Sequence, residues 1–234
     1  MKTIDQMTDD ERQEQVFLLA GLSDEYKLRK IGFTLDVLYD IGADCGSVTM
    51  FAHSIFPDTR IVAVEPNPWS FSRLAKNAAD IPQIVPINAA IGQGPLFQPA
   101  GEVGPLHWLV VDRDSPTWDN KLVPAAVQAI GLDELYSQHG GERYAVKVDI
   151  EGGEVAMIRH EPSRNVLINS SYFAAELHYW GSTREGMMEG VDTINRFLFE
   201  LAQTHTIYSY NYGACGHVWA KRRTPAESVE AWLG

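Results

Sequence analysis

A chain of 234 residues can bury one substantial hydrophobic core but is short for two full domains, so we expect one domain. Hydrophobic residues at 45% and charged residues at 21% are ordinary globular values, which exclude a disordered or fibrous protein. The 31 acidic and 19 basic side chains give a formal net charge of -12, which disfavours nucleic acid as a partner.

The spacing of the cysteines and the hydropathy of the sequence indicate where in the cell the protein is expected. Cys45 and Cys215 lie far apart, with no spacing typical of a zinc site or a disulfide framework, which suits a reducing compartment. The first residues lack the apolar segment of a signal peptide, and no apolar run approaches the roughly 20 residues that cross a bilayer. We therefore expect a cytoplasmic protein that does not bind a membrane.

The first predicted element is a helix close to the N-terminus. Residues 8–11, Thr-Asp-Asp-Glu, have the form of a capping box, and an apolar run at 16–20 follows them. We expect residues 1–36 to form a helical segment that packs on the edge of a sheet or acts as a lid over a substrate pocket. Simple packing is the favoured alternative.

From residue 37 onward, short apolar runs alternate with helical stretches, the pattern of βαβ units. Runs such as 61–64 are apolar throughout, as strands of a parallel sheet covered on both faces must be. The predicted fold class is α/β, a mostly parallel sheet with helices on both faces. The predicted strands are Val37–Ile41, Arg60–Glu65, Gln83–Asn88, Tyr144–Ile150 and Tyr172–His178.

The alternation fails between residues 94 and 124, a segment rich in proline that also contains Trp108 and Trp118. We predict an excursion there with a short strand at His107–Val111. Beyond the fifth strand, residues 187–202 have helical spacing. Two extended pieces, Thr206–Tyr210 and His217–Ala220, flank an Asn-Tyr-Gly turn and predict a C-terminal antiparallel hairpin.

The end of the first predicted strand carries the most informative motif. In the run 40–47, Asp-Ile-Gly-Ala-Asp-Cys-Gly-Ser, two glycines lie where a strand turns into a helix, the place where open parallel sheets bind ligands. Gly42 permits a sharp turn, and Gly46 permits close approach of a ligand or a strand to the helix. We expect Asp40 to accept a hydrogen bond from the amino group of an amino-acid ligand. A plain strand-to-helix turn is the alternative.

The second strand ends in Glu65, close to the roughly 20-residue offset from the glycine loop at which an acid binds ribose hydroxyls. Pro66 and Asn67 force a turn and leave the carboxylate at the strand tip, although a capping or surface acid is the alternative. Asn88 and Ala89, at the third strand end, are small and suit a flat adenine ring.

The glycine loop lacks the extra glycine of Gly-x-Gly-x-x-Gly, which brings the backbone close to a pyrophosphate. A ligand without phosphates fits better. S-adenosylmethionine has ribose and adenine, and carries a sulfonium and an amino-acid tail in place of the pyrophosphate.

Taken together, these motifs resemble the FkbM family of S-adenosylmethionine-dependent methyltransferases. The matching pieces occur in the family's order and cover roughly residues 37 to 180; they are 40–47, 64–68, 131–135, 147–154 and 176–178. The resemblance implies a Rossmann-like class I methyltransferase fold with a seven-stranded sheet, S-adenosylmethionine as donor, and usually a hydroxyl acceptor on a small molecule such as a natural product or a sugar. The sequence departs from the family pattern at Asp44-Cys45 and in the segment 94–124.

The predicted donor-binding residues come from four strand ends. They are Asp40, Gly42, Ala43, Gly46, Ser47, Glu65, Pro66, Asn67, Asn88, Ala89 and Asp149.

Transfer of a methyl group to a hydroxyl requires removal of the hydroxyl proton, which needs a base or a metal. Neighbouring parallel strands lie about 4.8 Å apart, so Asp149 can meet Glu176 and His178 if the fourth and fifth strands are adjacent. His178 is the predicted general base, with Asp149 or Glu176 orienting its ring. Alternatively, these three residues hold Mg²⁺ or Mn²⁺, which would lower the pKa of the hydroxyl. We rank the base narrowly ahead of the metal.

Three further charged residues surround this group. Lys147 lies inside a predicted buried strand, so we expect it to pair with an acid such as Asp149 or to reach a ligand. Glu151 and Glu154 are expected to complement the start of the following helix.

Two other classes of function remain open on the same fold. One is an NAD-dependent oxidoreductase, against which the missing glycine and the absence of a Tyr-x-x-x-Lys pair count. The other is a non-catalytic binding module that retains the fold.

Overall fold

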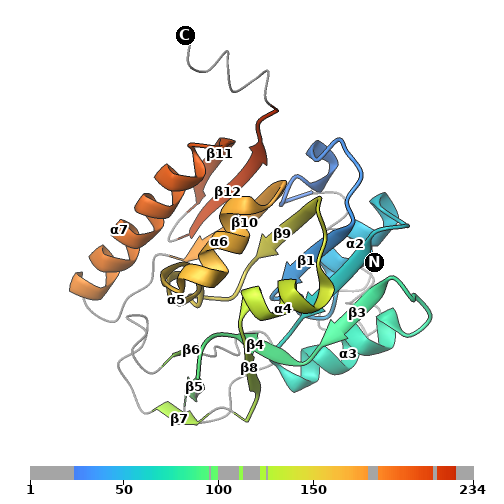
Figure 1. Ribbon diagram of the computed structural model, residues 1–234. Helices are drawn as coiled ribbons and strands as arrows, with labels where there is room; N and C mark the ends of the chain where they lie inside the picture. The colour runs from blue at the N-terminus through green and yellow to red at the C-terminus, as the bar shows by residue number, and fades with distance from the viewer. Residues whose placement is uncertain are drawn as a thin grey trace, which may run out of the picture.

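The structure is a computed structural model, and it describes residues 24–94, 96–99, 111–112, 122–124, 126–178, 184–212 and 215–224. At its centre is a seven-stranded sheet with the order β11-β12-β10-β9-β1-β2-β3 (Figure 1). The strands are β1 (Val37–Ile41), β2 (Arg60–Val64), β3 (Ile84–Ile87), β9 (Tyr144–Val148), β10 (Tyr172–His178), β11 (His205–Tyr212) and β12 (Cys215–Arg222).

The strand directions confirm the predicted Rossmann-like methyltransferase fold. β3, β2, β1, β9 and β10 pair in parallel, whereas β12 is antiparallel to both β10 and β11. The predicted C-terminal hairpin is therefore present. The predicted turn is wrong in part, because Asn211 and Tyr212 belong to β11, where they pair with Gly216 and Cys215.

Several predicted strands end earlier than expected. Glu65, Asn88 and Asp149 all follow the last residue of their strand. Glu65 and Asp149 still donate backbone hydrogen bonds to Ile87 and Ile41 on the neighbouring strands, and all three residues lie at the carboxyl edge of the sheet. The strands β1 and β10 have the predicted bounds.

Helices cover both faces of the sheet because side chains alternate between the faces along each strand. Tyr39 faces the core built with α4 (Leu132–His139), α5 (Glu154–Arg159), α6 (Glu161–Asn169) and α7 (Arg184–Leu201). Leu38 faces the core built with α2 (Ser47–Ile55), α3 (Pro68–Ala78) and the segment 26–35, which contains the short 3-10 helix η2 (Leu28–Lys30). α7 confirms the helix predicted from residue 187 and begins slightly earlier.

The predicted excursion leaves the main sheet after β3. β4 (Ala89–Ile91) pairs in parallel with β8 (Gln128–Ile130). Between them in the chain, β5 (Leu96–Pro99) pairs with β6 (Val111–Asp112) and β7 (Leu122–Pro124) in a small antiparallel sheet (Figure 1). Of the strand predicted at 107–111, only Val111 is among the described residues, and it begins β6.

The helix predicted from residues 8–20, and with it the lid predicted for the N-terminal segment, lies outside the described residues. Across the part of the chain that is described, no helix is both long and apolar enough to cross a membrane.

The topology determines where a ligand can bind. β1 and β9 are neighbours, but the chain continues from β1 toward β2 on one side and from β9 toward β10 on the other. Such a reversal opens a crevice at the carboxyl ends of the two strands. The site described next lies at this crevice.

Candidate functional site

A pocket opens at the carboxyl ends of β1, β2 and β9. Its walls come from the loops that follow these strands, together with the start of α3 and the strand β4. Six predicted donor-binding residues line it: Gly42, Glu65, Pro66, Asn67, Ala89 and Asp149. The lining also includes Asp44, Ser70, Ala90, Ile91, Ile150 and Glu151, which were not predicted as donor-binding residues.

The two glycines of the first loop are required by the chain itself. Gly42 has a φ of 77°, and a Cβ atom there would lie 1.7 Å from the backbone oxygen of Asp149. Gly46 has a φ of 96° and precedes α2, and its Cβ would lie 2.9 Å from Leu74 Cδ1 on α3. The close approach predicted at Gly46 is therefore made by a helix side chain. Gly42 brings the ends of β1 and β9 together at the floor of the pocket.

Glu65 lies at the tip of β2 with its carboxylate in the pocket wall. Its oxygens accept hydrogen bonds of 2.8 Å each from the backbone N–H groups of Asp44 and Asn67. Burial raises the pKa of Glu65 to about 7, although these two N–H groups act in the opposite direction. Each oxygen keeps further acceptor capacity, so this fixed carboxylate can receive two hydroxyl donors from the pocket.

The neighbours of Glu65 hold this wall in place. Asn67 Oδ1 caps α3 by accepting from the Trp69 N–H at 2.9 Å. Asn88 Nδ2 donates to the carbonyl oxygens of Glu65 and Pro66 at 2.9 and 3.1 Å. Asn88 therefore supports the wall from outside, and it is not among the lining residues.

Asp44 is a pocket acid that the sequence analysis did not assign. Its φ is 48°, and Asp44 Oδ1 accepts a 2.6 Å hydrogen bond from the Ser70 hydroxyl at the start of α3. The loop thus presents a carboxylate to the pocket close to Glu65. Ala43, Gly46 and Ser47, predicted to bind the donor, shape the same loop but do not line the pocket.

Asp40 and Lys147 form a buried ion pair beneath the loop. Lys147 Nζ lies 3.2 Å from Asp40 Oδ1 and donates to the Gly42 carbonyl oxygen at 2.6 Å. Thr49 Oγ1 donates to Asp40 Oδ2 at 2.5 Å. Burial alone would lower the pKa of Lys147, but the charges of Asp40 and Asp149 raise it.

We expected Lys147 to pair with an acid such as Asp149. The acid that forms the ion pair is instead Asp40. Asp40 is fully buried and is not among the residues that line the pocket. The amino-group contact predicted for Asp40 has no direct path in this geometry.

Asp149, Glu151 and His178 converge at the other wall of the pocket. Asp149 and Glu151 follow β9, and His178 ends β10. One side-chain ligand atom from each of the three lies within 4.8 Å of the others. Asp149 Oδ1 is buried without a hydrogen-bond partner among the described residues.

A buried glutamate orients the His178 ring. Glu154, with no exposed surface, accepts from His178 Nδ1 at 3.0 Å and also from the backbone N–H groups of Ile150 and Gly152. Nε2 then points toward Glu151 Oε2 at 3.4 Å and Glu176 Oε1 at 3.8 Å. Glu154 therefore does more than complement its helix, because it fixes both the loop and the imidazole.

The surroundings of His178 do not suit the predicted general base. Burial alone would lower its pKa, but the hydrogen bond and charge of Glu154, with the charges of Glu151 and Asp149, raise the pKa to about 9. Both ring nitrogens face carboxylates, Nδ1 toward Glu154 and Nε2 toward Glu151 and Glu176. A base must be free to accept a proton.

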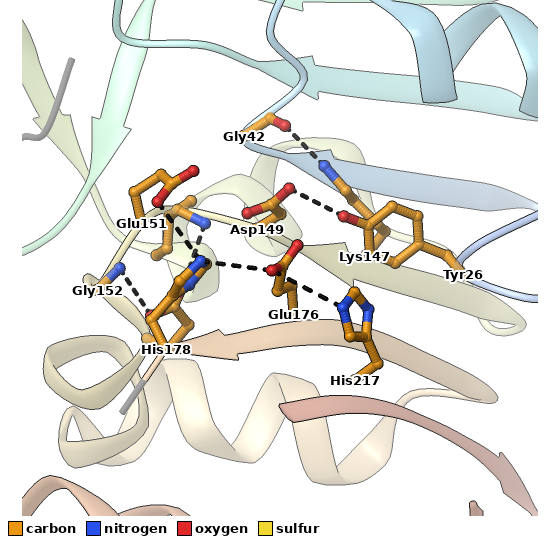
Figure 2. A network of polar contacts seen from close by, with 11 residues as sticks. Tyr26, Gly42, Lys147, Asp149, Glu151, Gly152, Glu176, His178 and His217 are labelled. Atoms are coloured by element: carbon orange, nitrogen blue, oxygen red, sulfur yellow. Dashed lines mark hydrogen bonds and ion pairs between the residues drawn. The ribbon is translucent and has the colours of Figure 1, made fainter. Parts of the chain in front are cut away.

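Glu176 lies between two histidines, as Figure 2 shows. Its Oε1 is 3.8 Å from His178 Nε2 and 3.8 Å from His217 Nε2, and His217 Nδ1 is 3.6 Å from the partly exposed Glu25. The predicted set of Asp149, Glu176 and His178 is thus close in space, but the tight three-residue group contains Glu151 in place of Glu176.

Tyr26 reaches this cluster from the segment before β1. Its hydroxyl donates to Asp149 Oδ2 at 2.9 Å, and its ring lies against Lys147, whose Nζ is 5.1 Å from the ring centroid (Figure 2). The Tyr172 hydroxyl on β10 donates to the backbone oxygens of Tyr26 and Lys27 at 2.9 Å each, which anchors the segment. Burial and the charge of Asp149 raise the pKa of Tyr26, so it remains a neutral donor.

No model of a known protein family matches the sequence, and no curated protein matches it. Solved structures do resemble it. A putative methyltransferase from Streptococcus mutans in complex with SAH is 10% identical with a TM-score of 0.49, over 86% of this chain and 96% of that one. A putative O-methyltransferase from Klebsiella pneumoniae is 11% identical with a TM-score of 0.49, over 95% and 84%. Fibrillarin from Aeropyrum pernix, bound to S-adenosyl-L-methionine, is 14% identical with a TM-score of 0.47, over 89% and 74%. Similarity at this level carries no assignment of activity or substrate.

Proposed function

We propose that this protein is an S-adenosylmethionine-dependent methyltransferase that methylates a hydroxyl group of a small molecule such as a natural product or a sugar. The observation that carries the proposal is the position of Glu65. Its fixed carboxylate faces the pocket at the topological reversal of the sheet, at the distance from the glycine loop expected for a ribose ligand. The order of the sequence motifs supports a distant relationship to the FkbM family.

The proposed donor pose follows from the pocket lining. The ribose diol binds Glu65, and the adenine ring lies against Ala89, Ala90 and Ile91 of β4. The amino-acid tail reaches the glycine loop, and the sulfonium carries its methyl group toward Asp149 and Glu151. These carboxylates favour the positive charge of the sulfonium donor.

Asp44 disfavours the dinucleotide alternative. NAD places a pyrophosphate at the loop after the first strand, where its negative charges need N–H donors and close backbone approach. Here the loop presents the Asp44 carboxylate to the pocket, close to the Glu65 carboxylate. Two acids at this position repel a pyrophosphate but tolerate a sulfonium and an ammonium group.

The acceptor is activated at the charged cluster around His178, which contains Asp149, Glu151 and Glu176. In the transfer, the acceptor oxygen forms a bond to the methyl carbon as the carbon–sulfur bond breaks, sulfur keeps the electron pair, and the hydroxyl proton passes to solvent water. A Mg²⁺ or Mn²⁺ ion held by the cluster would lower the pKa of the hydroxyl. Both nitrogens of His178 face carboxylates. This geometry favours activation of the hydroxyl by a metal ion over removal of its proton by His178.

The net charge of -12 supports a small-molecule acceptor over nucleic acid, and the two widely spaced cysteines support a cytoplasmic location.

Methyl transfer itself tests the proposal. The protein is incubated with S-adenosylmethionine labelled in the methyl group and a panel of hydroxylated small molecules, and labelled product is measured together with S-adenosylhomocysteine. We expect transfer to at least one hydroxyl compound, and its loss in Asp149→Ala and His178→Ala. Transfer that survives both substitutions contradicts the catalytic assignment, and a variant that still binds S-adenosylhomocysteine shows that the fold is intact.

A further inference from the structure

The cluster beside the donor pocket combines groups that share one chemical property, the capacity to bind a cation. One carboxylate oxygen each of Asp149 and Glu151 and one ring nitrogen of His178 lie within 4.8 Å of one another, and Asp149 and Glu151 line the pocket. Asp149 is half-buried and accepts from Tyr26 through Oδ2, but its other oxygen, Oδ1, is buried without a hydrogen-bond partner among the described residues.

A second feature is the support behind two of these residues. Residues that bind metal ions are usually held in orientation by hydrogen bonds from a surrounding shell. Here Glu154 accepts from His178 Nδ1, which leaves Nε2 directed at the cluster. Tyr26 donates to Asp149 Oδ2, which fixes one oxygen of the carboxylate, whereas Oδ1 is buried without a hydrogen-bond partner among the described residues. Each of the two side chains thus has one polar atom fixed by a hydrogen bond, and a cation bound to His178 Nε2, which faces Glu151 and Glu176, would replace the proton there.

From this geometry we propose that Asp149, Glu151 and His178 bind one divalent cation, Mn²⁺ or Mg²⁺, with Glu154 and Tyr26 as positioning residues. Two carboxylates balance the charge of a divalent ion, and oxygen-rich ligand sets suit Mg²⁺ and Mn²⁺. The site lies in the wall of the donor pocket, where an acceptor hydroxyl would meet the methyl group. The inference rests on the proposed function for the role of the ion, whereas binding of the ion does not depend on it.

The neighbouring group of Glu25, Glu176 and His217 is the obvious competitor. The lining of the donor pocket contains none of its members, whereas it contains both Asp149 and Glu151. Glu151 and Glu25 therefore provide a matched pair of substitutions that separates the two locations.

The experiment titrates the full chain with MnCl₂, without methyl donor, and follows free Mn²⁺ by electron paramagnetic resonance, with MgCl₂ as competitor. We expect one Mn²⁺ per chain, displaced by Mg²⁺. Asp149→Asn and Glu151→Gln should each raise the Kd for Mn²⁺ at least about tenfold, and Glu25→Gln should leave it unchanged within about twofold.

Two results would overturn the site: no saturable Mn²⁺ binding by the wild-type chain, or weakening by Glu25→Gln but not by Glu151→Gln. Calorimetric binding of S-adenosylhomocysteine to each variant shows whether the pocket is folded. It also separates the two claims. Mn²⁺ binding without S-adenosylhomocysteine binding removes the proposed function and keeps the ion site, and the reverse result removes only the ion site.

Discussion

Tyr26 and Asp149 are 123 positions apart in the chain, yet the Tyr26 hydroxyl donates a 2.9 Å hydrogen bond to Asp149 Oδ2. This contact ties the segment before β1 to the carboxyl end of β9, at the point where the proposed donor and acceptor meet. Tyr172 secures the tie from β10 through two hydrogen bonds to the backbone of Tyr26 and Lys27. Residues 26–27 thereby support the site from outside the sheet.

Replacement of this tyrosine by phenylalanine tests its role as a positioning residue. Tyr26→Phe keeps the ring against Lys147 but frees Asp149 Oδ2 to rotate. We expect kcat to fall about tenfold, as is typical when an orienting hydrogen bond behind a functional carboxylate is lost. The Kd for S-adenosylhomocysteine should remain unchanged, since Glu65 and the glycine loop are intact. An equal loss in kcat and in donor affinity would show a general structural role instead.

Donor binding should depend on pH through Glu65. Its pKa is raised to about 7 in the free protein, and ribose hydroxyls that donate to the carboxylate stabilise the ionised form and lower that pKa. Binding therefore releases a proton near and below pH 7, and the affinity is complete above pH 7 and falls about tenfold per pH unit below it. Calorimetry of S-adenosylhomocysteine binding between pH 5.5 and 8.5, in two buffers of different ionisation enthalpy, measures both effects.

Glu65→Gln is the matched control for this pH dependence. The amide keeps the size of the side chain but directs an NH₂ group at one of two backbone N–H donors. We expect the affinity for S-adenosylhomocysteine to fall about 10- to 100-fold, the range for a lost hydrogen bond to a charged group, and to become independent of pH between 6 and 8. Persistence of the wild-type pH profile in this variant would assign the titration to another group.

The loops after β1 and β9 meet at Gly42. We therefore expect alanine at Gly42 to lower the free energy of unfolding much more than alanine at Gly94. Gly42 and Gly94 have φ values of 77° and 76°, so alanine at either one incurs the left-handed penalty of about 1–2 kcal/mol. Only at Gly42 does a Cβ meet the Asp149 backbone oxygen, at 1.7 Å, whereas a Cβ at Gly94 meets nothing within 4 Å. Urea unfolding should show a loss of at least about 4 kcal/mol for Gly42→Ala. Similar losses for the two variants would contradict the described loop.

Lys147→Met should leave a buried, uncompensated Asp40 carboxylate and release the Gly42 carbonyl oxygen. Loss of one partner of a buried ion pair costs about 3–5 kcal/mol. The double variant Asp40→Asn with Lys147→Met should recover part of that loss, because no buried charge then remains unpaired. Urea unfolding of the two single variants and the double variant measures the coupling. Additive losses would show that the pair does not act as a unit.

Much of the fold could be predicted because a buried parallel strand has a simple signature. The runs 37–41 and 172–178 are nearly continuous in apolar residues, and the structure gives both strands the predicted bounds. Glu65 was placed in the pocket correctly for a similar local reason, since a strand that ends in an acid followed by Pro-Asn directs that acid to the edge of the sheet.

The remainder of the site depends on contacts between distant segments, which local patterns do not report. Asp40 lies in β1 and Asp44 in the loop that follows it, and the packing of Lys147 against Asp40 separates the buried acid from the acid that faces the pocket. Glu151 reaches His178 because Glu151 adopts a φ of 53° and Glu154 folds the loop back on itself. Tyr26 belongs to no recognisable sequence motif. Its one signal was an aromatic residue in an otherwise charged run, 24–27.

The most direct test of the central claim is isothermal titration of the wild-type protein with S-adenosylhomocysteine and, separately, with NAD. The geometry of Glu65, Asp44 and the glycine loop predicts one S-adenosylhomocysteine bound per chain and no binding of NAD. Tight binding of NAD with no binding of S-adenosylhomocysteine would contradict the assignment of this pocket to a methyl donor.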